Sequence, residues 1–128
     1  MDDRSAVITL GGEDYELILT TRATKEIAKR YGGLDEMGEK LLSTDDVGAT
    51  LDEIVWLLVT LANQSRMIHN FKNPKNQVKL VTAEEIELLT SPADFIDYKG
   101  AIMTAMQRGT QRNVLSEDDD TPKNAQGE

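Results

Sequence analysis

The stretch Val7–Leu19, VITLGGEDYELIL, places two short runs of alternating apolar and polar residues on either side of a glycine pair. Alternation with a period of two is typical of a half-buried β-strand, and Gly-Gly accepts the positive φ angles of a tight hairpin turn. The sequence therefore predicts a β-hairpin with strands near residues 5–10 and 14–20. Its apolar side chains are expected on one face: Ala6, Ile8, Leu10, Tyr15, Leu17 and Leu19.

The glycine pair leaves the register of this hairpin open. A two-residue loop pairs Ile8 with Tyr15, whereas a four-residue loop pairs Ile8 with Leu17, and both keep the same apolar face. A phosphate-binding loop is the other interpretation of Gly-Gly, but such a loop leads directly into a helix and usually contains Gly-Lys-Ser/Thr. Here a second strand with acidic residues follows, so we interpret the glycines as a turn.

Two short amphipathic helices are expected after the hairpin. Thr20 or Thr21 is suitably placed to cap the first, and Gly32-Gly33 ends it. The second has Asp35 and Glu36 in its first turn, where the helix dipole favours acids. The apolar residues of these two helices recur at helical spacing: Ala23, Ile27 and Tyr31, then Leu34, Met37 and Leu41.

A third helix, from about Leu51 towards His69, is expected to be the central element. Its apolar residues cover nearly the whole circumference, which is typical of a helix surrounded by protein, and Trp56 and Leu58 are expected to be largely buried. The β-branched residues leave a buried strand as the alternative. The stripe that indicates the helix consists of Leu51, Ile54, Val55, Leu58, Val59 and Ala62.

Residues 70–80 form a basic, turn-rich connection, and helical signals return after it. Thr82–Glu85 is a capping box that begins a short helix with Ile86 and Leu89 facing inward. Ser91-Pro92 begins a last helix that ends near Gly109. The core-facing residues predicted for this last helix are Phe95, Ile96, Ile102, Met103 and Met106.

The length of 128 residues corresponds to one domain, which we expect to span residues 1–115. The predicted fold class is α+β and mostly α-helical, with an N-terminal β-hairpin (about 5–20) packed on a small bundle of about four to five helices (about 21–109). Residues 116–128 have no apolar anchor and are expected to be a disordered acidic tail.

Charge and composition exclude several classes of function. The formal net charge is −9, from 14 basic and 23 acidic residues, which disfavours nucleic acid and anionic membranes as partners. Residues 61–80 differ, with four basic and no acidic residues. We interpret its basic part, from Arg66 to Lys79, as a solvent loop or a contact with an acidic protein, and a nucleic-acid surface is the less favoured alternative.

The chain contains no cysteine, and its N-terminus has no signal pattern. The longest apolar run, 54–61, is far shorter than the roughly 20 residues of a membrane span. We therefore expect a soluble, intracellular protein without thiol chemistry.

Few residues are candidates for a catalytic, cofactor-binding or metal site. The single histidine, His69, has no nucleophile or orienting carboxylate nearby in the sequence. The run Asp118-Asp119-Asp120 lacks the alternating spacing of an EF-hand loop. The pairs Asp45-Asp46 and Glu84-Glu85 fall where helix caps and first turns favour acids. We predict no catalysis, no cofactor and no metal.

Two roles are open for four of the methionines. Met37, Met67, Met103 and Met106 are expected to fill the core, and an adaptable binding surface is the alternative.

The order of the predicted segments resembles that of a known family. The hairpin ITLGGEDYELIL is followed by RATKEIAKRYGGLDEM, then by the apolar helix LDEIVWLLVTLANQS, further helices and a polar tail. Over roughly residues 5–110 this order is similar to that of the tail assembly chaperones of long-tailed phages and prophages, of the kind found in Gram-positive hosts.

The resemblance implies a non-enzymatic protein of the host cytoplasm that is absent from the mature virion. Such chaperones bind the tape-measure protein, keep it soluble and help recruit tail-tube subunits. In many relatives a frameshift near the C-terminus gives a longer second product. The resemblance assigns no partner-binding residues, and self-association stays open.

A different class is the alternative. Small acidic phage proteins can mimic nucleic acid and inhibit a host nucleic-acid-binding defence protein, which a net charge of −9 permits. The basic stretch 61–80 and the dispersed acids elsewhere disfavour it.

Overall fold

A computed structural model describes residues 3–42 and 46–111. The predicted tail 116–128 and the predicted domain end at 115 lie outside these residues. The described part has two strands, five α-helices and one short 3-10 helix, which confirms the α+β, mostly helical class. In chain order the elements are β1 (Ala6–Leu10), β2 (Glu13–Leu17), α1 (Thr21–Tyr31), α2 (Leu34–Leu42), α3 (Val47–Lys72), α4 (Ala83–Leu89), the 3-10 helix η1 (Pro92–Asp94) and α5 (Phe95–Thr110).

The hairpin adopts the two-residue register, with Leu10 opposite Glu13 and Ile8 opposite Tyr15. Gly11 and Gly12 have φ angles of 59° and 82°, as a type I′ turn requires. Strand β2 ends at Leu17, earlier than predicted, because the Ile18 N–H leaves the ladder and donates to the Leu61 carbonyl of α3 at 3.2 Å. The predicted apolar face is buried, except that Tyr15 is only partly so.

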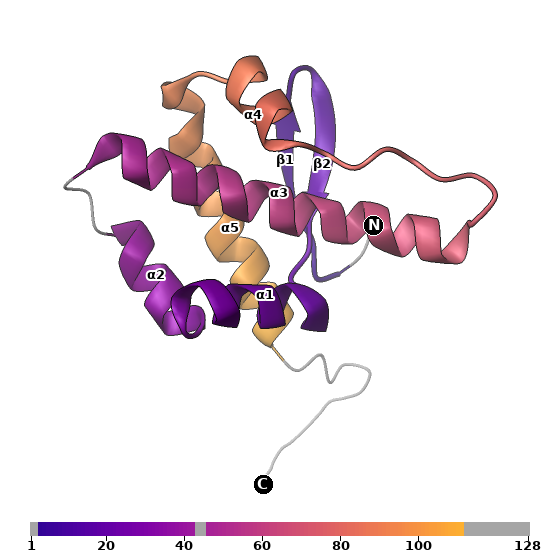
Figure 1. Cartoon of the computed structure of the whole chain (residues 1–128), viewed down its shortest axis with the longest axis horizontal. Helices are drawn as coiled ribbons and strands as arrows, with labels where there is room; N and C mark the ends of the chain where they lie inside the picture. The colour runs from indigo at the N-terminus through magenta and orange to yellow at the C-terminus, as the bar shows by residue number, and fades with distance from the viewer. Residues whose placement is uncertain (1–2, 43–45, 112–128) are drawn as a thin grey trace, which may run out of the picture.

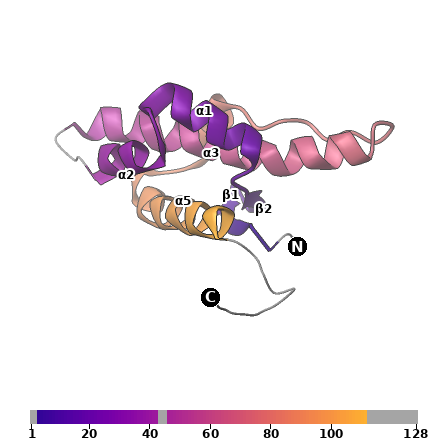
Figure 2. The ribbon, with the colours of Figure 1, turned by 90° about the horizontal axis from the view of Figure 1, so that it is seen from below.

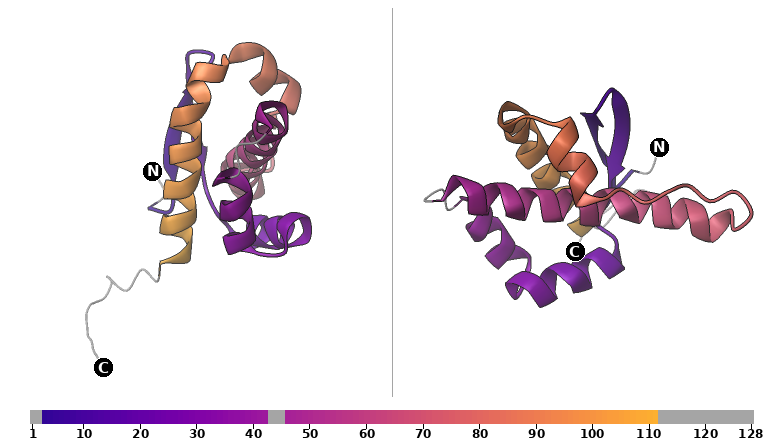
Figure 3. Two further views of the ribbon diagram at one scale, coloured as in Figure 1. Left: turned by 90° about the vertical axis from the view of Figure 1, so that its left-hand side faces the viewer. Right: turned by 45° about the horizontal axis from the view of Figure 1, so that its top comes forward.

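The elements form two layers. Figure 3 (left) shows α5 running alongside the hairpin in one layer, with α1, α2 and α3 in the other. Figure 2 shows the same arrangement from below, with α5 on the opposite side of the molecule from α1. The core lies between the layers, where α3 packs on β2 and α5.

Helix α3 is the central element, as predicted. Leu57, Leu58 and Leu61 are fully buried on it. It begins at Val47 rather than Leu51, because Asp46 caps it by accepting a hydrogen bond from the Ala49 N–H at 3.0 Å. Its C-terminal end extends past the hairpin, and the chain after it runs back alongside (Figure 1).

Trp56 on α3 is partly buried and packs against the core, with its ring centroid 6.0 Å from that of Tyr31. One prediction of burial on α4 was wrong. Ile86 is buried on α4 as predicted, but Leu89 is 54% exposed because it lies over the hairpin tip, beside Gly11.

The face that α5 buries differs from the predicted one. Ile96 and Met103 are 79% and 44% exposed. They lie beside the buried stripe, whose members recur three and four residues apart along the helix: Phe95, Tyr98, Ile102, Ala105 and Met106. Tyr98 belongs to this stripe because its hydroxyl donates to the Thr9 carbonyl of β1 at 2.9 Å.

The C-terminal end of α5 packs closely against the N-terminal segment. Arg108 donates from Nη1 to the Ser5 carbonyl. A Cβ atom at Gly109 would lie only 2.6 Å from the Cβ of Leu19, so glycine permits this close packing. The last helix therefore ends directly beside Ser5 and Leu19.

Candidate partner-binding groove

A groove lies between the N-terminal end of α1 and the C-terminal half of α3. We call it the α1–α3 groove, and its volume is about 490 Å³. Thr20 forms its corner, because the hydroxyl caps α1 by accepting from the Ala23 N–H at 3.0 Å and donates to Gln64 of α3 at 2.6 Å. The residues that line it are Arg4, Thr20, Thr21, Arg22, Gln64, Met67, Ile68, Phe71 and Lys72.

The part of the groove formed by the end of α3 is apolar. Phe71 is 88% exposed, and Met67 and Ile68, on the preceding turn, are only partly buried. Isolated exposed apolar residues are common on proteins, whereas neighbouring ones in a hollow are typical of contact sites. Methionine adds adaptability, because its unbranched side chain repacks around different partners.

The rim of the groove is basic. Arg4, Arg22 and Lys72 line it, and within residues 3–42 and 46–111 no acidic residue lines the groove. The chain as a whole has a net charge of −9, so this rim opposes the average charge of the protein. An apolar partner segment with acidic neighbours fits such a site.

The end of α3 that carries Phe71 is held by the segment that follows it. We call residues 73–82 the strap. Asn63 accepts from the Val81 N–H at 2.7 Å and donates to the Val81 carbonyl at 2.9 Å. Asn70 makes the same pair of hydrogen bonds to Val78, at 2.7 and 3.0 Å.

The two asparagines bind the strap at matching intervals. They are seven residues apart, which is about 10.5 Å along a helix, and three residues of extended chain cover about 9–10 Å. Between them, Arg66 donates from Nη1 to the Lys79 carbonyl at 2.6 Å. These contacts fix the strap through its main chain and thereby hold the projecting end of α3.

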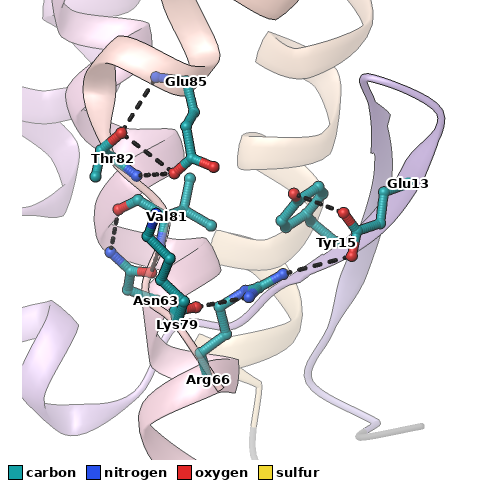
Figure 4. A network of polar contacts seen from close by, with 8 residues as sticks. All are labelled: Glu13, Tyr15, Asn63, Arg66, Lys79, Val81, Thr82 and Glu85. Atoms are coloured by element: carbon teal, nitrogen blue, oxygen red, sulfur yellow. Dashed lines mark hydrogen bonds and ion pairs between the residues drawn. The ribbon is translucent and has the colours of Figure 1, made fainter.

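Arg66 also connects the strap to the hairpin (Figure 4). Its guanidinium lies 4.8 Å from the centre of the Tyr15 ring, and Nη2 is 3.9 Å from Glu13 Oε2. The Tyr15 hydroxyl donates to Glu13 Oε1 at 3.1 Å. Burial and this hydrogen bond raise the pKa of Tyr15. The network is a structural connection between β2, α3 and the strap.

A second polar cluster joins α1 to the N-terminal half of α3. Tyr31 and Arg30 both donate to Glu53 Oε1, at 2.5 and 3.1 Å, and the Arg30 guanidinium lies 4.6 Å from the centre of the Trp56 ring. Burial opposes ionisation of Glu53, but the hydrogen bonds from Tyr31 and Arg30 outweigh it, so the pKa of Glu53 is lowered. Burial, followed by the hydrogen bond to Glu53, raises the pKa of Tyr31. The donors and the acceptor satisfy one another, which indicates an anchor between helices.

The sequence-predicted candidates that the structure describes lie on different elements: His69 and Asp46 at opposite ends of α3, and Glu84 and Glu85 on α4. His69 is exposed near the end of α3, and its Nε2 lies 3.0 Å from the Asn76 carbonyl, a contact that needs the proton on Nε2. Asp46 caps α3. Glu85 closes the predicted capping box by accepting from the Thr82 N–H at 2.9 Å, and this bond lowers the pKa of Glu85. Asp45 and the run Asp118–Asp120 lie outside the described residues.

The four methionines divide between core and surface. Met37 and Met106 are buried core residues, as predicted. Met67 lines the groove and Met103 is 44% exposed, so core filling does not describe these two.

Within residues 3–42 and 46–111, no three His, Cys, Asp or Glu side chains gather closely enough to hold a metal ion. In the same part of the chain, none of the helices combines the length and the apolar character needed to cross a membrane. Comparison with protein-family models, curated proteins and solved structures finds no match for this chain.

Sequence reasoning did not find the groove. Its walls come from segments more than 40 residues apart, as the Thr20–Gln64 hydrogen bond illustrates with a separation of 44 residues. The one local signal was Phe71, an aromatic residue in a basic, turn-rich stretch.

Proposed function

We propose that this protein is a non-enzymatic phage tail assembly chaperone that binds the tape-measure protein through the α1–α3 groove. The observation that carries the proposal is the exposed apolar surface of Phe71, Met67 and Ile68, held on the projecting end of a buried helix. An amphipathic helix docks in such a groove through its apolar face. The order of hairpin and helices, which resembles that of tail chaperones, supports the choice of partner.

The proposal also states where the protein acts and at which stage of tail assembly. The chaperone acts in the host cytoplasm, keeps the tape-measure protein soluble, assists recruitment of tail-tube subunits and leaves before the virion is complete. It needs no cofactor and no metal.

The alternative is an acidic inhibitor of a host nucleic-acid-binding defence protein. The net charge of −9 permits it. The basic rim of the groove opposes it, because a mimic of nucleic acid presents negative charge to its partner.

Co-expression with the tape-measure protein of the encoding phage or prophage tests the proposal. The wild-type chain should raise the solubility of that protein and co-purify with it in about 0.5 M salt. The Debye length is then only about 4–5 Å, whereas buried apolar area retains its effect. Phe71→Ser should lower the affinity at least about tenfold, because burying a Phe side chain is worth about 1.5–3 kcal/mol.

Ile96→Ser is the matched control. Ile96 is 79% exposed, comparable with Phe71, but lies on α5 and does not line the groove. Its substitution should leave binding unchanged. A tape-measure protein that stays insoluble beside the wild-type chain contradicts the proposal. Capture of a DNA-binding defence protein that is lost at high salt establishes the alternative.

A further inference from the structure

Helix α5 ends against the two short segments that lead into the lining of the α1–α3 groove. Arg108 binds the Ser5 carbonyl, and Gly109 packs on Leu19. The sequence neighbours of these two contact points, Arg4 and Thr20, both line the groove. The last described residue, Gln111, therefore closely follows two contacts with residues whose sequence neighbours line the groove, although it lies 90 residues after Thr21.

The sequence that follows Gln111 is acidic, whereas the described lining of the groove is basic. Glu117, Asp118, Asp119 and Asp120 are four consecutive acids, and they begin six residues after Gln111. Six residues span at most about 20 Å. Among the described residues, the groove lining includes three basic residues, Arg4, Arg22 and Lys72, and no acidic residue.

We propose that the acidic segment Glu117–Asp120 binds in cis to the basic rim of the α1–α3 groove and competes there with the partner. The competition rests on the proposed function, whereas the contact itself does not. Exposed ion pairs are individually weak and are screened by salt. Attachment to the same chain raises their effective concentration to the millimolar range. The segment thus weakens partner binding by about threefold to tenfold, and it yields to a partner whose apolar side chains bury against Phe71.

The contact is tested on the full chain by ¹H–¹⁵N correlation spectra at about 20 mM salt. The test variant carries Glu117→Gln, Asp118→Asn, Asp119→Asn and Asp120→Asn. The amide resonances of residues 20–22 and 67–72 should differ between the wild-type chain and this variant. The difference should disappear at about 0.5 M salt, where exposed charges are screened.

A second variant controls for the loss of four negative charges. It removes four exposed acids outside the groove, through Glu39→Gln, Asp52→Asn, Glu87→Gln and Asp97→Asn. In this variant the groove amides should keep their wild-type positions. If the amide resonances of the groove residues have the same positions in the wild-type chain and the tail variant at low salt, the proposal is overturned. Shifts that grow with protein concentration also overturn it, because they assign the contact to a second copy.

The competition is measured with the tape-measure protein and the same two variants. Neutralising residues 117–120 should raise the affinity about threefold to tenfold at low salt and leave it unchanged at high salt. The control variant should bind as the wild type does. Salt-sensitive groove shifts without any tape-measure binding would contradict the proposed function alone. Tape-measure binding that is indifferent to the tail charges would contradict the competition alone.

Discussion

Asn63 and Asn70 provide a comparison of one interaction in two environments. Each side chain makes the same two hydrogen bonds to the main chain of a strap valine. Asn63 and its partner Val81 are 7% and 5% exposed, whereas Val78, the partner of Asn70, is 39% exposed. We therefore expect Asn63→Ala to destabilise the protein much more than Asn70→Ala.

The difference in stability between the two variants depends on what takes the place of the deleted asparagine side chain. In Asn63→Ala the Val81 N–H and carbonyl lose their partner in a buried site, and each unsatisfied buried group costs about 1–3 kcal/mol. In Asn70→Ala water takes over at Val78, so the loss is at most about 1 kcal/mol. Both substitutions replace asparagine by alanine within one helix, so the gain in helix propensity cancels in the comparison.

Urea denaturation of both variants measures this difference. The free energy of unfolding should fall by about 2–5 kcal/mol for Asn63→Ala, and the melting temperature by about 10 °C or more. Amide exchange at Val81 should accelerate in that variant. Equal losses of stability in the two variants, within about 0.5 kcal/mol, would show that burial does not control the strength of these clamps.

Three further predictions concern the core, the turn and the tyrosines. Leu58→Ala should lower the free energy of unfolding by about 2–5 kcal/mol in urea, because Leu58 is fully buried; unchanged stability would refute its central position. Gly12→Val should lower the free energy of unfolding by at least about 1–2 kcal/mol in the same assay. The cause is backbone strain at φ +82° and not a steric clash, because no atom lies within 4 Å of the added Cβ. The pKa values of Tyr15, Tyr31 and Tyr98 are raised mainly by burial. The folded state therefore favours the neutral hydroxyls, and the stability linked to these groups is present below about pH 10 and is lost as the pH rises further. Tyrosinate absorbance near 295 nm should therefore lag behind that of the unfolded chain, and coincidence of the two curves would contradict the burial of the hydroxyls.

Local signals in the sequence predicted the elements of the fold well. The caps at Thr20 and Thr82 are hydrogen bonds to residues only three positions away, so a short window contains both partners. The turn at Gly11-Gly12 is equally local, because the positive φ angles need glycine at those positions. The sequence left both the two-residue and the four-residue hairpin loop open, because the two registers bury the same side chains.

Orientation and site geometry were not predictable in the same way. Ile96 and Met103 are as apolar as the residues that α5 buries, and the positions of β1 and α3 together decide which stripe faces inward. The strap clamps join residues that are 18 positions apart for Asn63 and 8 for Asn70, but they form only because the chain returns antiparallel to α3, which the turn-rich composition of residues 70–80 does not specify. The groove is a product of the same long-range packing.

The meeting of β1 with α5 has a consequence for synthesis of the protein. The Tyr98 hydroxyl and the Thr9 carbonyl that it binds are 89 residues apart in the chain. A ribosome that adds about 5–20 residues per second needs about 4–18 s to produce the intervening segment. The hairpin therefore emerges from the exit tunnel several seconds before the helix that covers it. Nascent chains that stop before Phe95 would retain this uncovered surface and so become substrates for host chaperones or for aggregation.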